Sequence, residues 1–179
     1  MFDLDPVDED RFGDARRAAL SLRELLDGEL GLTSFVKTTG GKGLHVHVPL
    51  RAEDDFDTVR AFTRQAAGLL AARHPDLVTA EQRKERRGGR IYADIMRNAY
   101  AQTVVAPYSV RARPGAPVAV PLHWEELEDN GLRPGRFTLR TVRARLDQTA
   151  GKADPWAGLS RRRYSLDRAS QVLDQLARR

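Results

Sequence analysis

Apolar residues recur along the chain with the period of a helix in two long segments. In Asp14–Leu30, alanines and leucines return every three or four residues, which predicts an amphipathic helix that Gly31 ends. A second stripe of this kind in Val59–Leu70 predicts a helix that stops before Pro75. Each helix should bury one face against a shared core.

Shorter segments alternate apolar and polar residues, as strands do. These segments are Phe2–Asp5, Ser34–Thr38, Leu44–Leu50 and Ile91–Met96. Together with the two helices they give the order strand, helix, strand, strand, helix, strand. That order predicts an α+β fold with an RNA-recognition-like βαββαβ core, whose antiparallel or mixed sheet carries both helices on one face. The other face is left free for a ligand.

The second half of the chain is richer in prolines and carries weaker patterns. A short helix is expected at His123–Leu127, and further helices are expected near Thr138–Leu146 and Leu166–Leu176. A length of 179 residues suits one folded unit. We therefore expect residues 1–159 to form one core and residues 160–179 to form a basic C-terminal helix packed on it or flanking it.

Composition narrows the classes of protein that need to be considered. The chain has no cysteine, which excludes disulfides and thiolate zinc sites, and no apolar run approaches the roughly 20 residues that span a bilayer. We therefore expect a soluble, cytoplasmic protein with no membrane partner. The net charge of +5 comes from arginine-rich clusters. Such clusters fit either a nucleic-acid footprint or an ordinary solvated surface.

Three aspartates are candidate metal ligands. Asp3 and Asp5 are two residues apart in a predicted strand, so both carboxylates should project from the same face. Asp94 lies among apolar residues in another strand, where a charge is costly unless it is compensated. Paired carboxylates suit two divalent cations of the kind used in phosphoryl transfer. The alternatives are that Asp3 and Asp5 cap a helix or are solvated, and that Asp94 is half exposed or pairs with Arg97.

A glycine-rich segment, Thr39–Gly43, joins two of the predicted strands. Its backbone N–H groups can converge on an anion, Lys42 adds a positive charge and Thr39 adds a hydroxyl donor. The segment is not a Walker A loop, because a strand rather than a helix follows it. An ordinary hairpin turn is the alternative. His45 and His47 share a strand face beyond the loop, and we favour His45 as the functional one and His47 as an exposed or hydrogen-bonded residue.

Taken together, these segments resemble the polymerase/primase domain of bacterial end-joining DNA ligase D, in the archaeo-eukaryotic primase superfamily. The resemblance is carried by Phe2–Pro6, Ser34–His45, Ile95–Asn98 and Ala106–Gly115, in the same order along the chain. It implies a nucleotidyltransferase that adds nucleotides, often ribonucleotides, to DNA ends or gaps in repair. It also implies Ku and a DNA ligase as partners.

The resemblance assigns roles to particular residues. Asp3, Asp5 and Asp94 would be catalytic and would hold two divalent ions, manganese or magnesium. The nucleotide-binding residues it implies are Thr39, Gly40, Lys42, His45, Arg97 and Arg111. Thr39 stands where the family typically has serine, and Val7 stands where it has glycine. Relatives also carry a long segment before the acidic strand that grips the template.

Two other interpretations compete with an active polymerase. The chain could be a truncated nucleotide- or nucleic-acid-binding module without independent polymerase activity, and exposed core could then lead to self-association. Alternatively, Phe2–Asp5 resembles the nucleophile motif of haloacid dehalogenase-like phosphatases. In that class a Gly-Thr pair is expected after the second aspartate, whereas Pro6 and Val7 follow here.

Overall fold

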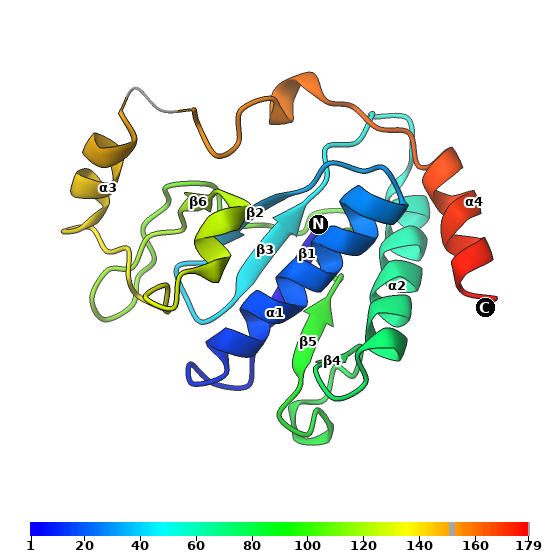
Figure 1. Ribbon diagram of the computed structural model, residues 1–179, viewed down its shortest axis with the longest axis horizontal. Coiled ribbons are helices and arrows are strands. Elements are labelled where there is room, and N and C mark those ends of the chain that lie inside the picture. The colour runs from blue at the N-terminus through cyan, green and yellow to red at the C-terminus, as the bar shows by residue number, and fades with distance from the viewer. Residues whose placement is uncertain (151–152, 179) are drawn as a thin grey trace.

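A single mixed sheet forms the centre of the computed structural model, which describes residues 1–150 and 153–178. The sheet has six strands in the order β4-β5-β1-β3-β2-β6. Figure 1 shows helices α1 and α2 lying across the same face of this sheet. The strands are β1 (Phe2–Asp5), β2 (Phe35–Thr38), β3 (Leu44–His47), β4 (Val78–Thr79), β5 (Ile91–Asp94) and β6 (Pro121–Leu122).

Two long helices supply the layer that covers the sheet. Helix α1 (Phe12–Arg23) continues directly into a π-helical segment, η1 (Glu24–Glu29). Helix α2 (Phe56–Arg73) begins after Asp55, whose carboxylate accepts a hydrogen bond of 2.8 Å from the Thr58 N–H, as a helix N-cap does. The remaining helical segments are η2 (Lys84–Arg86), η3 (Trp124–Glu128), α3 (Val142–Thr149), η4 (Leu159–Arg161) and α4 (Asp167–Leu176).

The central strand β1 separates the core from the opposite face of the sheet. Phe2 and Leu4 are fully buried and pack with the inner residues of α1, including Ala15 and Leu22. Because side chains alternate along a strand, Asp3 and Asp5 project from the other face. The same alternation that builds the hydrophobic core therefore presents the acidic pair on the side away from the helices.

The predicted α+β fold is confirmed, and the six predicted elements occur in the predicted order, with β4 inserted before the last of them. The sheet is wider than predicted because β4 and β6 are added at its edges, and each has only two residues, too few to show an alternation. Strand β3 ends at His47 rather than Leu50, which forms an isolated bridge to Tyr164. Strand β5 ends at Asp94 rather than Met96.

The C-terminal helices differ from one another in how they meet the core. Helix α4 lies beside α2 and buries Ala169 and Leu173. The helix expected at Thr138–Leu146 instead spans Val142–Thr149, at the opposite end of the molecule (Figure 1), and buries none of its residues. The short helix near His123 is a 3₁₀ segment.

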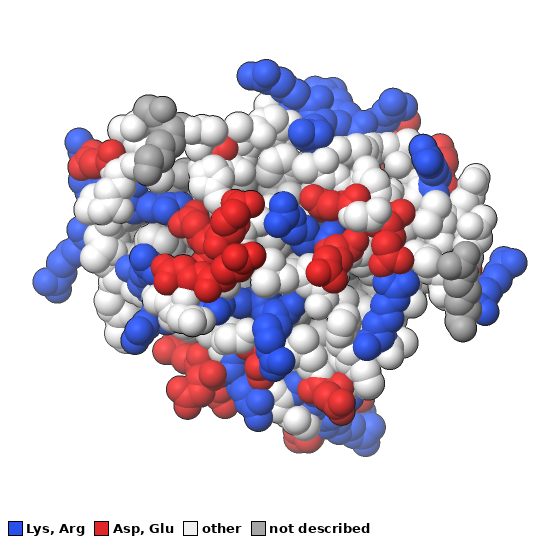
Figure 2. Space-filling model, in the orientation of Figure 1, with Lys and Arg blue, Asp and Glu red and all other residues white. Residues whose placement is uncertain are grey.

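Charge on the helical face does not separate into regions of one sign. Figure 2 shows basic and acidic side chains interspersed over the face that α1 and α2 cover. No helix within the described ranges is both long enough and apolar enough to cross a membrane.

Candidate active site

Strand register aligns four polar residues in one row across the sheet. Lys37 of β2 is opposite His45 of β3, and His45 is opposite Asp3 of β1. On its other side Asp3 is opposite Asp94 of β5. Directly opposed residues in antiparallel strands share a face. The row therefore brings residues far apart in sequence together on the face away from the helices, and Asp5 lies on the same face two residues along β1.

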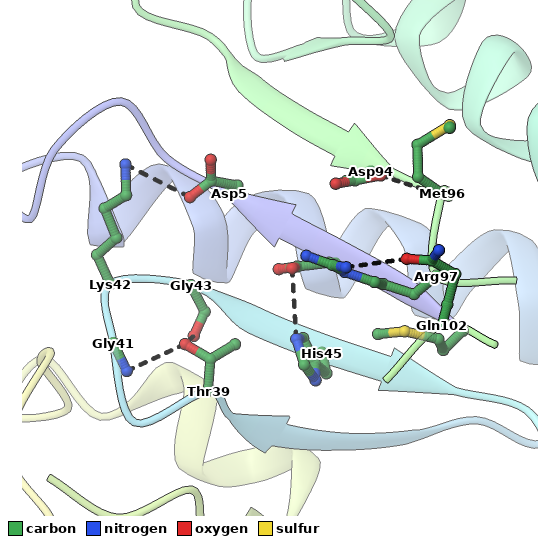
Figure 3. A network of polar contacts seen from close by, with 12 residues as sticks. Asp5, Thr39, Gly41, Lys42, Gly43, His45, Asp94, Met96, Arg97 and Gln102 are labelled. Atoms are coloured by element: carbon green, nitrogen blue, oxygen red, sulfur yellow. Dashed lines mark hydrogen bonds and ion pairs between the residues drawn. The ribbon is translucent and has the colours of Figure 1, made fainter. Parts of the chain in front are cut away.

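Each of the three aspartates has a different partner, and Figure 3 shows Asp5 facing Lys42 and Asp94 facing Met96. The Asp3 carboxylate lies 3.4 Å from Nε2 of His45. The Asp94 carboxylate turns back to accept a 2.7 Å hydrogen bond from the backbone N–H of Met96. Within residues 1–150 and 153–178, no three His, Cys, Asp or Glu side chains are already gathered as a metal cluster. The backbone aligns the carboxylates, and the side chains point to separate partners.

Asp5 is held by two cations. Its carboxylate lies 3.1 Å from Nη1 of Arg87 and 3.4 Å from Nζ of Lys42. Arg87 is 8% exposed, and its guanidinium also stacks 4.3 Å from the centre of the Tyr92 ring. Because an arginine this buried needs compensation, Asp5 and the Tyr92 ring together keep Arg87 against the acidic strand.

The basic members of the row are deeply buried. Lys37 is fully buried, and burial lowers its pKa to about 8, although the nearby Asp3 carboxylate acts in the opposite direction. Burial also lowers the pKa of His45, again against the effect of Asp3. His45 is therefore neutral near pH 7, with Nε2 toward Asp3 and with Nδ1 buried and unpaired in the described structure.

The glycine-rich segment forms a tight turn at the end of this row. Thr39 closes it, because its Oγ1 donates to the Gly43 carbonyl at 3.1 Å and accepts from the Gly41 N–H at 3.1 Å. A Cβ on Gly43 would lie 2.7 Å from the Leu4 carbonyl oxygen, so only glycine allows this turn to approach β1. Gly40 has a φ of +66° and lies directly beneath the Arg111 side chain.

A cavity of about 440 Å³ opens between the acidic strand, this turn and the segment after β5. Its basic lining is Lys42, Arg97, Arg111 and Arg113, and its wall includes Thr103–Val105. Arg111 is anchored by a 2.9 Å hydrogen bond from Nη1 to the Thr39 carbonyl. Three arginines and a lysine around one cavity, with aspartates at its edge, favour an anionic ligand that also carries divalent metal.

Most of the residues expected from the sequence come together here. The cavity is lined by Asp3, Asp5, Thr39, Lys42, His45, Arg97 and Arg111. Gly40 packs beneath Arg111 and does not line the cavity. Asp94 does not line it either, but it lies directly opposite Asp3 in the sheet. The alternative pairing of Asp94 with Arg97 is not seen, since Arg97 donates to Oε1 of Gln102 at 3.1 Å.

His47 differs from expectation, because it is neither exposed nor hydrogen-bonded. Its ring is half-buried against Trp156, with the ring centres 5.1 Å apart, and its Nε2 is buried without a partner in the described part of the chain. Burial lowers the pKa of His47 to about 2. Trp156 is fixed in turn by a 2.9 Å hydrogen bond from its indole N–H to the Val36 carbonyl.

Sequence reasoning assigned no role to Lys37, Arg87 or Arg113. The sequence did contain a signal for Lys37, because a charged residue stands among apolar neighbours in a predicted strand, as Asp94 does in its own strand. Lys37 is also two residues from Thr39, so the two side chains are expected on the same face. Arg113 could have been found from its two-residue spacing to Arg111. Arg87 could not, because its contact with Asp5 depends on how the loop between β4 and β5 folds back over the sheet.

The acidic row lies on the open face of an RNA-recognition-like sheet, beside an arginine-lined cavity. This arrangement is typical of nucleotidyltransferases that bind metal and nucleotide on a β-sheet. The comparison with protein families agrees with this class. The family model described as "LigD, primase-polymerase domain" matches residues 1–156, and the chain belongs to that family.

The chain is similar to bacterial end-joining proteins. It is 38% identical over 172 residues to the multifunctional non-homologous end joining protein LigD of Pseudomonas aeruginosa, covering 94% of this chain and 20% of that protein. It is 36% identical over 143 residues to the bifunctional LigD of Bacillus subtilis, covering 79% of this chain and 23% of that protein. The chain therefore spans about a fifth of the length of these relatives.

One solved structure shares both fold and sequence with the chain. It is the polymerase domain of Mycobacterium tuberculosis ligase D in complex with DNA. The TM-score is 0.79 and the identity is 32%, over 91% of this chain and 55% of the solved one.

Proposed function

We propose that the chain is a metal-dependent nucleotidyltransferase that adds nucleotides or ribonucleotides to DNA ends or gaps in end-joining repair. The observation that carries this proposal is the register of Asp3 opposite Asp94, on the open face of the sheet and beside the arginine-lined cavity. Family membership supports the class of reaction. The relatives' names support the setting in non-homologous end joining.

Asp3, Asp5 and Asp94 are the proposed metal ligands. Their donors fit magnesium or manganese, because hard divalent ions prefer carboxylate oxygens, and all three lie on the same face of adjacent strands. When bound, two such ions supply Lewis-acid stabilisation of charge on the reacting phosphate and favour ionisation of a primer 3′-hydroxyl. Asp5 has to turn away from Lys42 or Arg87 to take part.

The cavity is the proposed site for the triphosphate of the incoming nucleotide. Arg111 presents a planar guanidinium anchored at Thr39, and Lys42 adds a mobile ammonium at the turn. Thr39 and the backbone of Gly41 and Gly43 complete the pocket, Gly40 supports Arg111 from beneath, and Arg97 extends the pocket on the side of β5. These groups hold the phosphates in line for attack, which is where most of the catalytic effect arises in phosphoryl transfer.

The reaction that this arrangement supports is a displacement at the α-phosphate. The primer 3′-oxygen forms a bond to the α-phosphorus, the bond from that phosphorus to the bridging oxygen breaks, and pyrophosphate leaves with its negative charge against the arginines. His45 is buried beside Asp3 and lines the cavity, so it is proposed both to orient that carboxylate and to contact the nucleotide. DNA ends and nucleoside triphosphates are the proposed substrates, with Ku and a DNA ligase as partners by family analogy.

Replacing Asp94 tests the proposal directly. Asp94→Ala should reduce manganese-dependent primer extension by at least about 100-fold, because even groups that only support metal ligands contribute 10- to 100-fold. Primer extension with labelled DNA is the measurement, and thermal unfolding verifies that the variant is folded. Asp76→Ala, at an exposed residue away from the row, is the matched control. Undiminished extension by the Asp94 variant would remove Asp94 from the site.

A nucleotide-binding module without independent polymerase activity is the second candidate. It is favoured by the two cations, Lys42 and Arg87, that already pair with Asp5. The same assay separates the two functions when it is paired with nucleotide binding. Manganese-dependent binding of a nucleoside triphosphate without extension supports the module, whereas binding with extension supports the polymerase.

A further inference from the structure

A second cavity, of about 220 Å³, lies where the sheet loses its edge strand. Strand β4 pairs with β5 only at Ile91 and Tyr92, so the outer edge of β5 is uncovered by β4 from Ala93 onward. The cavity occupies this position, between the end of β5, the start of the loop after β4, and helix α2. It is separate from the arginine-lined cavity described above and shares no lining residue with it.

Two arginines of α2, Arg60 and Arg64, line this cavity without a neutralising acid. They are four residues apart and so lie on the same side of the helix. In the described part of the chain neither forms an ion pair, and the cavity has no Asp or Glu in its lining. The cavity is therefore a concentrated positive site.

Arg60 in particular is poorly satisfied. Its Nη2 donates to Sδ of Met96 at 3.2 Å, and a thioether sulfur is a weak acceptor. Its Nε is buried and has no partner among the described residues. A guanidinium that is partly buried and bonded only to sulfur retains most of its capacity to bind an anion. Arg64 is exposed and free of side-chain hydrogen bonds in the described structure, so it can reach the same anion.

Positive charge continues beyond the cavity along the neighbouring loop. Gln82 lines the cavity, and Arg83, Lys84 and Arg86 follow it with exposed side chains. Within the described residues these three form no ion pair, although Glu81 and Glu85 lie in the same loop. A single small anion would use only the two arginines of the cavity. A line of cations that extends past it fits a polyanion whose charges repeat.

The cavity is also close to the proposed site of reaction. Met96, which receives the Arg60 hydrogen bond, is the residue whose backbone N–H holds the Asp94 carboxylate at 2.7 Å. Arg60 and Asp94 therefore both contact Met96, so a ligand bound to Arg60 lies close to the end of β5 where the acidic row is placed. An extended strand of nucleic acid passing over this edge could place its terminus at the row.

We infer that Arg60 and Arg64 form a binding site for the phosphodiester backbone of a DNA strand, at the open edge of β5. This inference deepens the proposed function and rests on it for the choice of DNA as the ligand. Arginine suits the role because its planar fork can donate two hydrogen bonds to one phosphate. The loop cations carry neighbouring phosphates, and the strand end lies toward Asp94.

Equilibrium DNA binding without metal or nucleotide tests this site apart from catalysis. The probe is a fluorescent duplex with a 3′ overhang, titrated by anisotropy over a series of salt concentrations. Arg60→Gln and Arg64→Gln should each weaken binding several-fold and lower the slope of log affinity against log salt by about 1, and the double variant should lower it by about 2. Arg168→Gln, an exposed arginine on α4, is the matched control and should change neither quantity by as much.

Several outcomes would overturn the inference. It fails if the wild-type chain does not bind the duplex, or if the Arg64 and double variants match Arg168→Gln in affinity and slope. It also fails if inorganic phosphate, at matched ionic strength, stabilises the wild type but not the double variant while DNA binding is unchanged, because the site would then hold free anions. Arg64→Gln guards against misfolding, since the exposed Arg64 side chain forms no hydrogen bond or ion pair within residues 1–150 and 153–178.

The inference and the proposed function can fail separately. If the double variant loses DNA binding while the wild type shows no manganese-dependent extension, the DNA-binding site is supported and the catalytic proposal is rejected. Normal extension and normal DNA binding by the double variant remove this site alone.

Discussion

At the scale of single residues, the row across the sheet holds buried positive charge that stability alone does not explain. Lys37 is fully buried and its Nζ has no hydrogen-bond partner in the described structure, an arrangement that usually costs several kcal/mol. Its nearest compensation is the Asp3 carboxylate. A cation kept at this cost beside an acidic strand is expected where local charge serves binding rather than packing.

His47 makes folding sensitive to mild acid. Its pKa of about 2 in the folded chain lies far below its ordinary value of 6.5, so the unfolded chain binds the additional proton between these limits. Stability is therefore full above about pH 6.5 and falls as the pH decreases toward 2. From pH 7 to pH 5 the free energy of unfolding should drop by about 2 kcal/mol through His47 alone.

Urea unfolding at several pH values measures this effect. His47→Gln should show a smaller drop between pH 7 and pH 5 than the wild type, with the remainder coming from other groups such as His45, whose pKa is also lowered. Equal pH dependence in the variant and the wild type would show that His47 is not the group responsible.

Gly43 is required by a close contact rather than by its backbone angle. Gly43→Ala would place a methyl group 2.7 Å from the Leu4 carbonyl oxygen, and the turn would have to move away from β1. We expect a loss of about 1–3 kcal/mol in unfolding free energy, together with weaker nucleotide binding because Thr39 and Lys42 move with the turn. Denaturant unfolding and a nucleotide titration are the measurements.

The matched control for that change is Gly68 on α2. A Cβ there meets no atom within 4 Å, so Gly68→Ala should stabilise the helix by about 0.5–1 kcal/mol without affecting the site. Destabilisation by both substitutions to the same extent would contradict the steric explanation for Gly43.

At the scale of elements, sequence patterns predicted the inner part of the fold better than its edges. The stripe in Asp14–Leu30 and the alternations around Asp3 and Val46 reflect burial of one face, which is a local signal. Edge strands β4 and β6 have two residues each and are defined by pairing with distant segments. Their existence follows from tertiary structure and leaves no period in the sequence.

The candidate site shows the same division between local and distant signals. The spacing of Asp3 and Asp5 and the glycines of the Thr39–Gly43 turn indicated a site from sequence alone, and these residues lie together in the structure as expected. The partners of their carboxylates could not be recognised in this way, because Arg87 contacts Asp5 from a loop that has no hydrophobic periodicity. The acidic strand and the glycine-rich turn were therefore predictable from local spacing, whereas the pairing of Arg87 with Asp5 was not.

Helix α4 is expected to unfold together with the rest of the molecule. Leu173 is fully buried and belongs to the same hydrophobic core as α2. Leu173→Ala should reduce the free energy of unfolding by about 2–5 kcal/mol, the usual cost of removing a buried leucine side chain. Urea unfolding followed by circular dichroism should give one transition, moved to lower urea. A separate early transition confined to a small part of the helical signal would show that α4 flanks the core without supporting it.

At the scale of the whole molecule, metal binding should be visible in global stability. A ligand that binds only the folded state at 100 times its dissociation constant adds about 2.7 kcal/mol, which raises Tm by about 5–10 °C in a chain of this size. Manganese should produce such a shift in the wild type. Asp3→Asn should abolish most of it, and Asp76→Asn should leave it intact, as differential scanning fluorimetry can establish. An equal shift in all three proteins would place the metal elsewhere.

The position of β1 has a consequence for how the protein is made. This strand is translated before both of its neighbours in the sheet, β3 and β5. At bacterial rates of about 5–20 residues per second, Asp94 follows Asp3 by on the order of 10 s. Until then the nascent chain carries an unpaired apolar strand with two acidic side chains. Its central position in the sheet therefore delays assembly of the three proposed metal ligands until β5 has been translated.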